Sequence, residues 1–279
     1  MNARRPLGIL IPASNEAGQI DACLQALLDS DPVPRREVAV VVIANGCKDD
    51  TARRARAYAG AARARGWTLL VEERAQGSKP AALNAGEAAI PSGDLIYLDA
   101  DVTVSKPLIA QMAAALDVEA PCYAGGTACL VPPRSAVSRA YARFWLLLPF
   151  HRGVAPGFGL FGVNAAGRAR WGAFPQIISD DTFVRLQFAP SERVQVPATY
   201  RWPLAEGLGR LIRVRRRQDR GVAELRARYP DLMANEDKPP LELGPLVRSA
   251  PLGFAAYALV ALAVRLTAWR HGTQFVRGR

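Results

Sequence analysis

The chain has 279 residues, of which 50% are hydrophobic, 22% charged and 8% aromatic; this composition fits one large globular domain, or a domain with an appendage, and excludes a disordered chain. Its net charge of +11 suggests a polyanionic neighbour such as nucleic acid, anionic lipid or a phosphorylated ligand, although an arginine-rich and alanine-rich genome would give the same excess. The four cysteines and two histidines are scattered, so neither a zinc site nor a disulfide framework is indicated, and we expect a reducing compartment.

The first 117 residues alternate between short apolar runs and helical patterns. The runs predict strands at 7–13, 37–46, 67–73 and 94–102, and the patterns predict helices at 15–30, 49–66, 79–90 and 105–117. This alternation predicts βαβ units, and the near-continuous apolar strands fit a mostly parallel sheet covered by helices on both faces. We therefore predict a Rossmann-like α/β fold, in which ligands bind beyond the carboxyl ends of the strands.

Polar side chains follow each of the four predicted strands. Any one group fits a turn or a helix N-cap, because Ser, Asn and Asp favour both. All four groups fall on one edge of one sheet, which favours a shared binding site. In chain order they are Ser14, Asn15 and Glu16; Asn45, Asp49 and Asp50; Gly77, Lys79 and Asn84; and Asp99 and Asp101.

The stretch LIYLDADV, residues 95–102, is an apolar run that ends in two carboxylates. Alternate side chains at the end of a strand point the same way, so Asp99 and Asp101 can reach one site. Carboxylate oxygens suit Mg²⁺ or Mn²⁺, and Mg²⁺ commonly completes its shell with phosphate oxygens. The pair therefore indicates a metal-bridged diphosphate, with Lys79 as a further positive charge. Taken alone, the D-x-D pattern is common by chance, and an acidic turn is the alternative.

The remainder of the chain has a different texture. Glycine and aromatic residues dominate 118–174, and Asp180 and Asp181 then precede a helical pattern. Six arginines lie between Arg210 and Arg220, and we expect them to contact a diphosphate or to form a solvated or lipid-facing basic surface.

An apolar run from Ala250 to Val264 is shorter than the ~20 residues that span a bilayer. It fits a buried core helix, an interfacial helix or a poor transmembrane helix. The flanking Arg248 and Arg265, together with Trp269, favour contact with an anionic cytoplasmic leaflet, to which residues 144–150 could add a second apolar contact. The N-terminal apolar stretch is too short for a signal peptide, so we expect a cytoplasmic protein, peripheral on the inner face of the membrane.

Six segments together resemble family 2 glycosyltransferases, which have the GT-A fold. They lie in the family's order within about 7–187 and read ILIPASNEAGQI, VVVIANGCKDDTA, GSKPAALNAGEAA, DLIYLDADV, GLFGVNAAGRARWGAF and SDDTFVRLQ. The resemblance implies inverting, metal-dependent transfer of a sugar from a nucleoside-diphosphate sugar to a saccharide or lipid-linked acceptor, in bacterial polysaccharide or glycolipid synthesis. It implies a catalytic domain at 1–235, with a nucleotide-sugar half at about 1–117 and an acceptor half at about 118–235, followed by a linker and an apolar, basic helical segment at 236–279.

The resemblance also implies roles for single residues. Asp181 would be the general base, Asp101 and Asp99 would hold Mn²⁺ or Mg²⁺, and Asp180 and Arg217 would contact the substrate or its diphosphate. The nucleotide-sugar site would consist of Pro12, Ser14, Glu16, Asn45, Lys79, Asp99, Ala100 and Asp101.

Two departures from the family pattern affect these expectations. Ala44 and Asn45 stand where the family usually has two acidic residues, which leaves the base preference open, because asparagine offers both a donor and an acceptor. The Q-x-x-R-W segment of processive relatives is replaced by RVRRRQDRG, so we expect a single addition.

Two other functions are weighed against sugar transfer. A metal-dependent nucleotidyltransferase would need a Gly/Arg-rich phosphate loop after the first strand, and PASNEAG does not supply one. A basic nucleic-acid-binding protein would need aromatic residues among its arginines, which are absent from 210–220, so we expect no nucleic acid partner.

Overall fold

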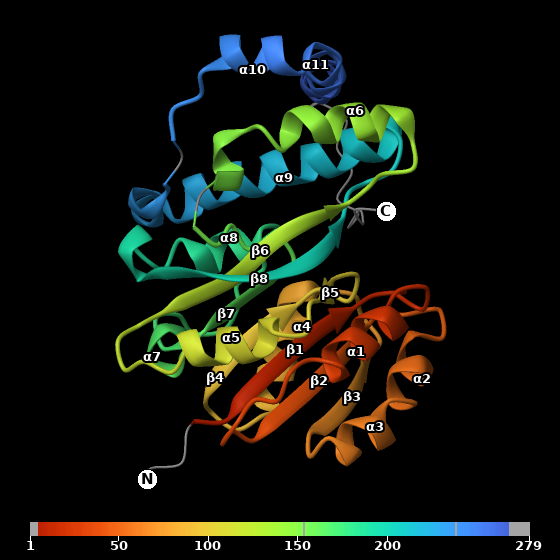
Figure 1. Cartoon of the computed structure of the whole chain (residues 1–279), viewed down its shortest axis with the longest axis vertical. Coiled ribbons are helices and arrows are strands. Elements are labelled where there is room, and N and C mark those ends of the chain that lie inside the picture. Colours follow the sequence, from red (N-terminus) through yellow and green to blue (C-terminus); the bar gives the residue numbers. More distant parts are fainter. Residues whose placement is uncertain (1–4, 153, 238, 268–279) are drawn as a thin grey trace.

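The computed structural model describes residues 5–152, 154–237 and 239–267, which fold around one eight-stranded sheet with the strand order β3-β2-β1-β4-β7-β6-β8-β5 (Figure 1). The strands are β1 (Leu7–Ala13), β2 (Val38–Asn45), β3 (Thr68–Arg74), β4 (Asp94–Leu98), β5 (Thr103–Val104), β6 (Tyr123–Val131), β7 (Leu160–Val163) and β8 (Arg193–Pro203). The α-helices are α1 (Ile20–Leu28), α2 (Thr51–Arg56), α3 (Ala59–Ala64), α4 (Lys79–Ala88), α5 (Leu108–Ala115), α6 (Ala136–Trp145), α7 (Ala165–Arg168), α8 (Asp180–Arg185), α9 (Leu208–Arg228), α10 (Leu243–Ser249) and α11 (Pro251–Leu266). Short 3₁₀ helices are η1 (Pro149–Arg152), η2 (Pro190–Glu192) and η3 (Pro230–Asn235).

The predicted α/β fold, a sheet flanked by helices, is confirmed. Strands β3, β2, β1 and β4 pair in that order, and they run parallel, as βαβ units require. Beyond β4 the sheet is mixed, because β7 pairs antiparallel with both β4 and β6, while β6 and β8 run parallel to each other. The carboxyl ends of β1 to β4 consequently share one edge, where the sequence placed its polar groups.

Both faces of the central parallel strands β2, β1 and β4 are buried, whereas the edge strand β3 is largely exposed. Ile9 and Ile11 of β1 belong to one hydrophobic cluster with α1 and α5, whereas Leu10 between them belongs to a second cluster with α4. All three side chains are fully buried, and each contributes about 1.5–3 kcal/mol of burial free energy. Alternation between two covered faces explains why the strand appears in the sequence as an unbroken apolar run.

Three element boundaries differ from the prediction. The helix predicted from residue 15 begins at Ile20, and Asn15 adopts a left-handed backbone with φ of 48°. The pattern predicted as one helix at 49–66 forms two, α2 and α3. The fourth strand ends at Leu98, so the two aspartates lie in the turn that leads to β5.

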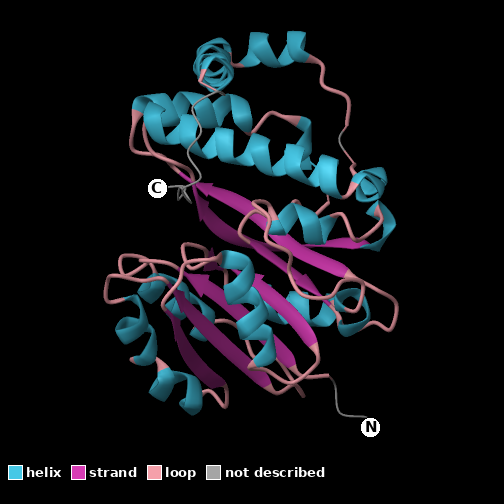
Figure 2. Cartoon of the chain, turned by 180° about the vertical axis from the view of Figure 1, so that it is seen from behind, coloured by secondary structure: helices cyan, strands magenta, loops and turns pink. Residues whose placement is uncertain are grey.

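A third hydrophobic cluster joins α6, α9 and α11 at one end of the molecule, alongside β6 and β8 (Figures 1 and 2). Phe144 of α6 and Val260 of α11 are fully buried in it. The apolar run at 250–264 is thus partly core helix. The expectations for Trp269 and for the rest of 268–279 lie outside the described residues.

The two C-terminal helices α10 and α11 are bent by 118° relative to each other. In the part of the chain that the structure describes, no helix taken singly is long and apolar enough to cross a membrane; the bent pair meets those criteria of length and composition when its two helices are counted together.

Candidate active site

Lys79 is the first residue of α4, whose N-terminus is capped by the Ser78 hydroxyl. Its Nζ lies 3.0 Å from Asp99 Oδ1 and 3.1 Å from Asp180 Oδ2, so it joins the turn after β4 to the start of α8. Burial lowers the pKa of Lys79, but the charges of Asp180 and Asp99 outweigh burial and raise it above its ordinary value. Lys79 is therefore a fixed cation at physiological pH.

The turn after β4 is held by backbone contacts. The Asp99 N–H donates to the Gly159 carbonyl at 2.8 Å, and the Val102 N–H donates to the Asp99 carbonyl at 3.0 Å. Gly159 has φ of 69°, and a Cβ there would lie 3.2 Å from Asp99 Oδ2. Ala100 is buried between the two aspartates. A glycine is required at 159 because the backbone is left-handed and passes close to a carboxylate.

Asp180 and Asp181 begin α8. Asp180 is 3% exposed, and its Oδ2 contacts Lys79 without a hydrogen bond of good geometry. Asp181 Oδ1 accepts a hydrogen bond from the Thr182 N–H at 2.7 Å. Burial and the neighbouring charge of Asp180 raise the pKa of Asp181, and Lys79 opposes the rise. The result is a carboxylate more basic than an ordinary aspartate.

The loop after β1 is tied to the start of α2. The Glu16 N–H donates to Thr51 Oγ1 at 2.7 Å, and the Thr51 hydroxyl donates to Asp49 Oδ1 at 2.5 Å. The Ala17 N–H donates to Asp49 Oδ2 at 3.2 Å. Asp49 therefore orders two loops at the strand edge, and Asp50 pairs with Arg53 on the surface.

Asn45, at the end of β2, is buried, and its Oδ1 accepts a hydrogen bond from the Ser78 N–H at 2.9 Å. Next to it, Gly46 has φ of 62°, and a Cβ there would lie 2.8 Å from the Gly77 nitrogen. The amide side chain thus fixes the loop that carries Lys79, a role that an acidic residue would also fill by accepting the same hydrogen bond.

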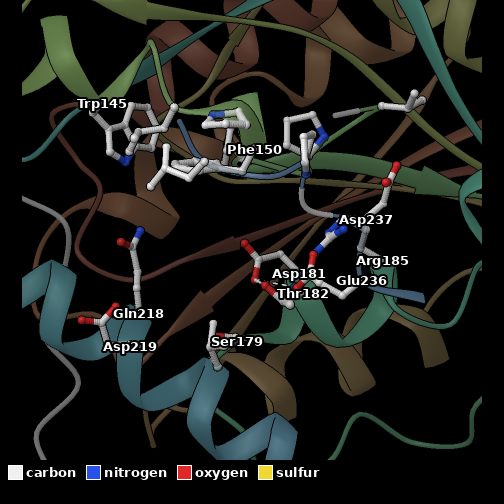
Figure 3. Close-up of a pocket in the computed structure, with 18 of the residues that line it drawn as sticks. Trp145, Phe150, Ser179, Asp181, Thr182, Arg185, Gln218, Asp219, Glu236 and Asp237 are labelled. Carbon is white, nitrogen blue, oxygen red and sulfur yellow. Dashed lines mark hydrogen bonds and ion pairs between the residues drawn. The ribbon is translucent and has the colours of Figure 1, made fainter. Parts of the chain in front are cut away.

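Two cavities meet at Asp181. The first, about 180 Å³, is lined by the charged groups of the turn after β4 and of α8, together with Trp145 and Trp202. The second, about 390 Å³, combines aromatic and apolar side chains with charged ones such as Arg185, Glu236 and Asp237 (Figure 3). Of the predicted site residues, the first cavity brings together Lys79, Asp99, Asp101, Asp180, Asp181 and Arg217.

The other predicted residues lie elsewhere on the same strand edge. Pro12 lines a smaller cavity with Lys79 and Asp99. The remaining four are not in the linings of these three cavities; they are Ser14, Glu16, Asn45 and Ala100.

Several residues of the site were not predicted from the sequence. Trp145 and Phe150 lie in the second cavity across from Asp181 (Figure 3), and Phe158 also lines this cavity. Arg185 pairs with Glu236 at 2.7 Å beside Asp181. The only sequence signal for the second cavity is the density of aromatic residues and glycines at 144–159, which indicates no particular side chain.

A divalent cation would rest on few protein ligands. Among the described residues, no group of three or more His, Cys, Asp or Glu side chains is arranged to hold a metal ion. Asp101 and Asp99 line one cavity, and Lys79 already contacts Asp99. This arrangement fits Mg²⁺ or Mn²⁺ bound by one or two carboxylates and completed by phosphate oxygens of a ligand.

The sequence matches a known protein family. The model described as glycosyl transferase family 2 matches residues 8–155, more than half of the chain. No curated protein matches the sequence of this chain.

Solved structures resemble the chain in fold. Mannosyltransferase PcManGT from Pyrobaculum calidifontis, in complex with GDP-Man and Mn²⁺, has a TM-score of 0.59 and 20% identity over 96% of this chain and 76% of its own. S. aureus TarS 1–349 has a TM-score of 0.52 and 14% identity over 97% of this chain and 76% of its own, and it has also been solved with UDP-GlcNAc. Glucosyl-3-phosphoglycerate synthase from Mycobacterium tuberculosis, in complex with UDP, has a TM-score of 0.53 and 17% identity over 84% of this chain and 82% of its own. At these identities the likeness shows the fold alone.

Proposed function

The chain belongs to glycosyl transferase family 2 and is a glycosyltransferase, and on this premise we propose that it transfers one sugar from a nucleoside-diphosphate sugar to an acceptor hydroxyl with inversion of the anomeric carbon. The position of Asp181 carries this proposal, because this carboxylate lines both the charged first cavity and the second one. A donor in the first cavity and an acceptor in the second would meet at Asp181.

The proposed step is a single displacement. The acceptor oxygen forms a bond to the anomeric carbon while the bond from that carbon to the diphosphate oxygen breaks. Asp181 takes the proton of the acceptor hydroxyl, and the bond electrons leave with the nucleoside diphosphate. The raised pKa of Asp181 suits this task, since a more basic carboxylate accepts the proton more readily.

The charged cavity would hold the diphosphate. Lys79 and Arg217 line it together with Asp101, and the two cations would balance the charge that develops on the leaving group. Asp101, with Asp99, would hold Mn²⁺ or Mg²⁺, which when bound supplies further charge stabilisation at the phosphate oxygens. The complex of PcManGT with GDP-Man and Mn²⁺ supports a nucleotide sugar and a divalent cation as ligands of this fold.

We assign the nucleoside to the neighbouring edge of β1 and β2, formed by Pro12, Ser14, Glu16 and Asn45, with the Ala100 backbone beside it. Neighbours of this fold were solved with guanosine and with uridine nucleotides, so the choice of base is left to experiment. Asn45 would act there through the loop that it fixes by its bond to Ser78.

We propose that the acceptor is a saccharide or a lipid-linked molecule, that one sugar is added per encounter, and that the enzyme works in bacterial polysaccharide or glycolipid synthesis at the cytoplasmic face of the membrane. In this scheme residues 1–235 form the catalytic domain, with donor and acceptor halves divided near residue 117, and residues 236–279 form a C-terminal segment.

The test is Asp181→Asn, which removes the base and keeps the shape. We expect transfer to fall by about 10²–10⁴-fold. Binding of the donor, measured by thermal shift with UDP-, GDP- and dTDP-sugars and Mn²⁺, is expected to persist. Asp50→Asn, on the surface beside Arg53, is the matched control and should leave transfer intact. Near-normal turnover in the Asp181 variant would refute its role as the base.

A further inference from the structure

Helix α11 has apolar residues on two opposite faces. Gly253, Val260 and Val264 are buried against α6 and α9. Leu252, Leu259 and Leu262 are exposed by 78%, 50% and 54%, and their spacing of seven and three residues puts them on one side of the helix. The core therefore accounts for one face of α11 and leaves a leucine stripe, defined as these three residues, at the surface.

The helix with the leucine stripe also contributes to the second cavity. Tyr257 of α11 lines it, held by a hydrogen bond from Arg215 at 2.8 Å, and Leu241, just before α10, lines it as well. Leu241 is 50% exposed, so this wall reaches the surface. Apolar side chains thus extend from Asp181 past Phe158 and Trp145, whose rings are 5.6 Å apart, toward the C-terminal helices.

The charged residues of helices α10 and α11 themselves are of one sign, and the exposed Glu242 directly precedes α10. Between Leu243 and Leu266 the sequence has two charged residues, Arg248 and Arg265, and both are exposed. The chain as a whole carries +11. A second copy docked on the stripe would bring like charges together, whereas an anionic lipid surface would neutralise them and accept the leucines.

We propose that the acceptor is an amphiphile carried by an anionic membrane surface, with its hydroxyl at Asp181, its apolar chain along the wall of Phe158, Trp145 and Leu241, and the leucine stripe seated in the same leaflet. This inference rests on the proposed glycosyl transfer and specifies its acceptor. The volume of the cavity, about 390 Å³, lies within the range of pockets that bind small molecules, about 300–1,000 Å³.

Vesicle flotation tests the membrane contact. The full chain is mixed with vesicles of phosphatidylcholine alone or of phosphatidylcholine with phosphatidylglycerol. We expect binding to the mixed vesicles, weakened by salt, and at least about a tenfold loss of binding in the double variant Leu259→Gln/Leu262→Gln. The matched control is Leu70→Gln, an exposed leucine of β3 in the opposite half of the molecule, which should bind as the wild type does.

The acceptor class is tested with soluble probes. Methyl and octyl glycosides of the same sugars are compared as acceptors, and the octyl forms are expected to be at least about tenfold better. Leu241→Gln should reduce that preference, and Leu70→Gln should keep it. Equal use of both glycoside series would overturn the amphiphilic acceptor.

The outcomes separate this inference from the function on which it rests. Donor binding with no flotation on mixed vesicles overturns the membrane contact and leaves glycosyl transfer standing. A dimer in gel filtration that the double leucine variant dissociates, again without flotation, assigns the stripe to a second copy and also overturns it. Failure of every nucleotide sugar to bind refutes the proposed function itself.

Discussion

The two cavities that Asp181 lines differ in the kinds of side chain around them. We call the first the donor side and the second the acceptor side, after the proposed function. On the donor side, Lys79 contacts the carboxylates of two distant segments, and the loops are fixed by hydrogen bonds such as that between Asn45 and Ser78. In the second cavity, Phe150, Val154 and Leu241 belong to an apolar wall, and charged side chains such as Glu236 and Asp237 line the same cavity. In the proposed scheme, the donor would be held by charge and fixed geometry, and the acceptor by apolar contacts together with charged groups.

The largest loss of stability is expected from Lys79→Met, a change on the donor side. Loss of the ammonium leaves the buried Asp180 and the nearby Asp99 without their counter-charge, and breaking such a pair costs about 3–5 kcal/mol. Urea unfolding measures the change in the free energy of unfolding. The matched control, Lys106→Met, alters an exposed lysine and should change it by less than about 0.5 kcal/mol.

The pH dependence of stability in the Lys79 variant gives a second test of the charge on Lys79. Its pKa is raised in the folded protein, so its contribution to stability is complete below the ordinary lysine value of about 10.4 and is lost as the pH rises through the folded pKa. The difference in stability between wild type and variant should therefore stay constant from pH 7 to about 10. A difference in stability that shrinks between pH 7 and about 10 would contradict the conclusion that Lys79 stays charged over this range.

An intermediate effect is expected from Gly159→Ala, in the wall of the first cavity. Alanine at φ of 69° costs about 1–2 kcal/mol, and its Cβ would lie 2.9 Å from Val102 and 3.2 Å from Asp99 Oδ2, which adds about 1–3 kcal/mol. Thermal unfolding should show a loss of roughly 2–5 kcal/mol together with weaker donor binding. Gly172→Ala, where a new Cβ meets nothing within 4 Å, is the control; equal effects of both changes would contradict the close packing at Gly159.

The smallest expected effect is a loss of stability at acidic pH, caused by His151 next to Trp145. Burial lowers the pKa of His151, which lies against Trp145, to about 4. The unfolded chain binds a proton near pH 6.5, so stability is complete above that pH and falls as the pH decreases toward 4. After allowance for partial solvent screening, the loss between pH 7 and 5 is roughly 1–2 kcal/mol. His151→Phe should flatten the decline in melting temperature over this range, and parallel curves for the two proteins would contradict the assignment.

The sequence predicted the donor side far better than the acceptor side. The four parallel strands and the polar groups that follow them are local patterns. The βαβ rule specifies that these strands run parallel, but it does not specify that β4 lies beside β1. The errors there are local too. Asn15 adopts a left-handed backbone that delays α1, and the continuous pattern at 49–66 gave no sign of the break between α2 and α3.

The acceptor side depends on contacts between residues far apart in the chain. Strand β6 pairs with β8 about seventy residues later, and β7 inserts between β4 and β6. No periodicity in the sequence specifies such partners. The wall of the second cavity likewise combines Trp145, Arg185 and Tyr257 from three separate helices, so aromatic composition alone could not identify it.

Strand β4 has one consequence for exchanging parts between related enzymes. It pairs parallel with β1 on one edge and antiparallel with β7 on the other, and the Asp99 N–H donates to the Gly159 carbonyl just before β7. The segment that presents the two aspartates is therefore a shared component of both halves. A chimera of two related enzymes should therefore take β4 and β7 from the same parent. If they came from different parents, the pairing of β4 with β7 and the hydrogen bond between Asp99 and Gly159 would be disturbed.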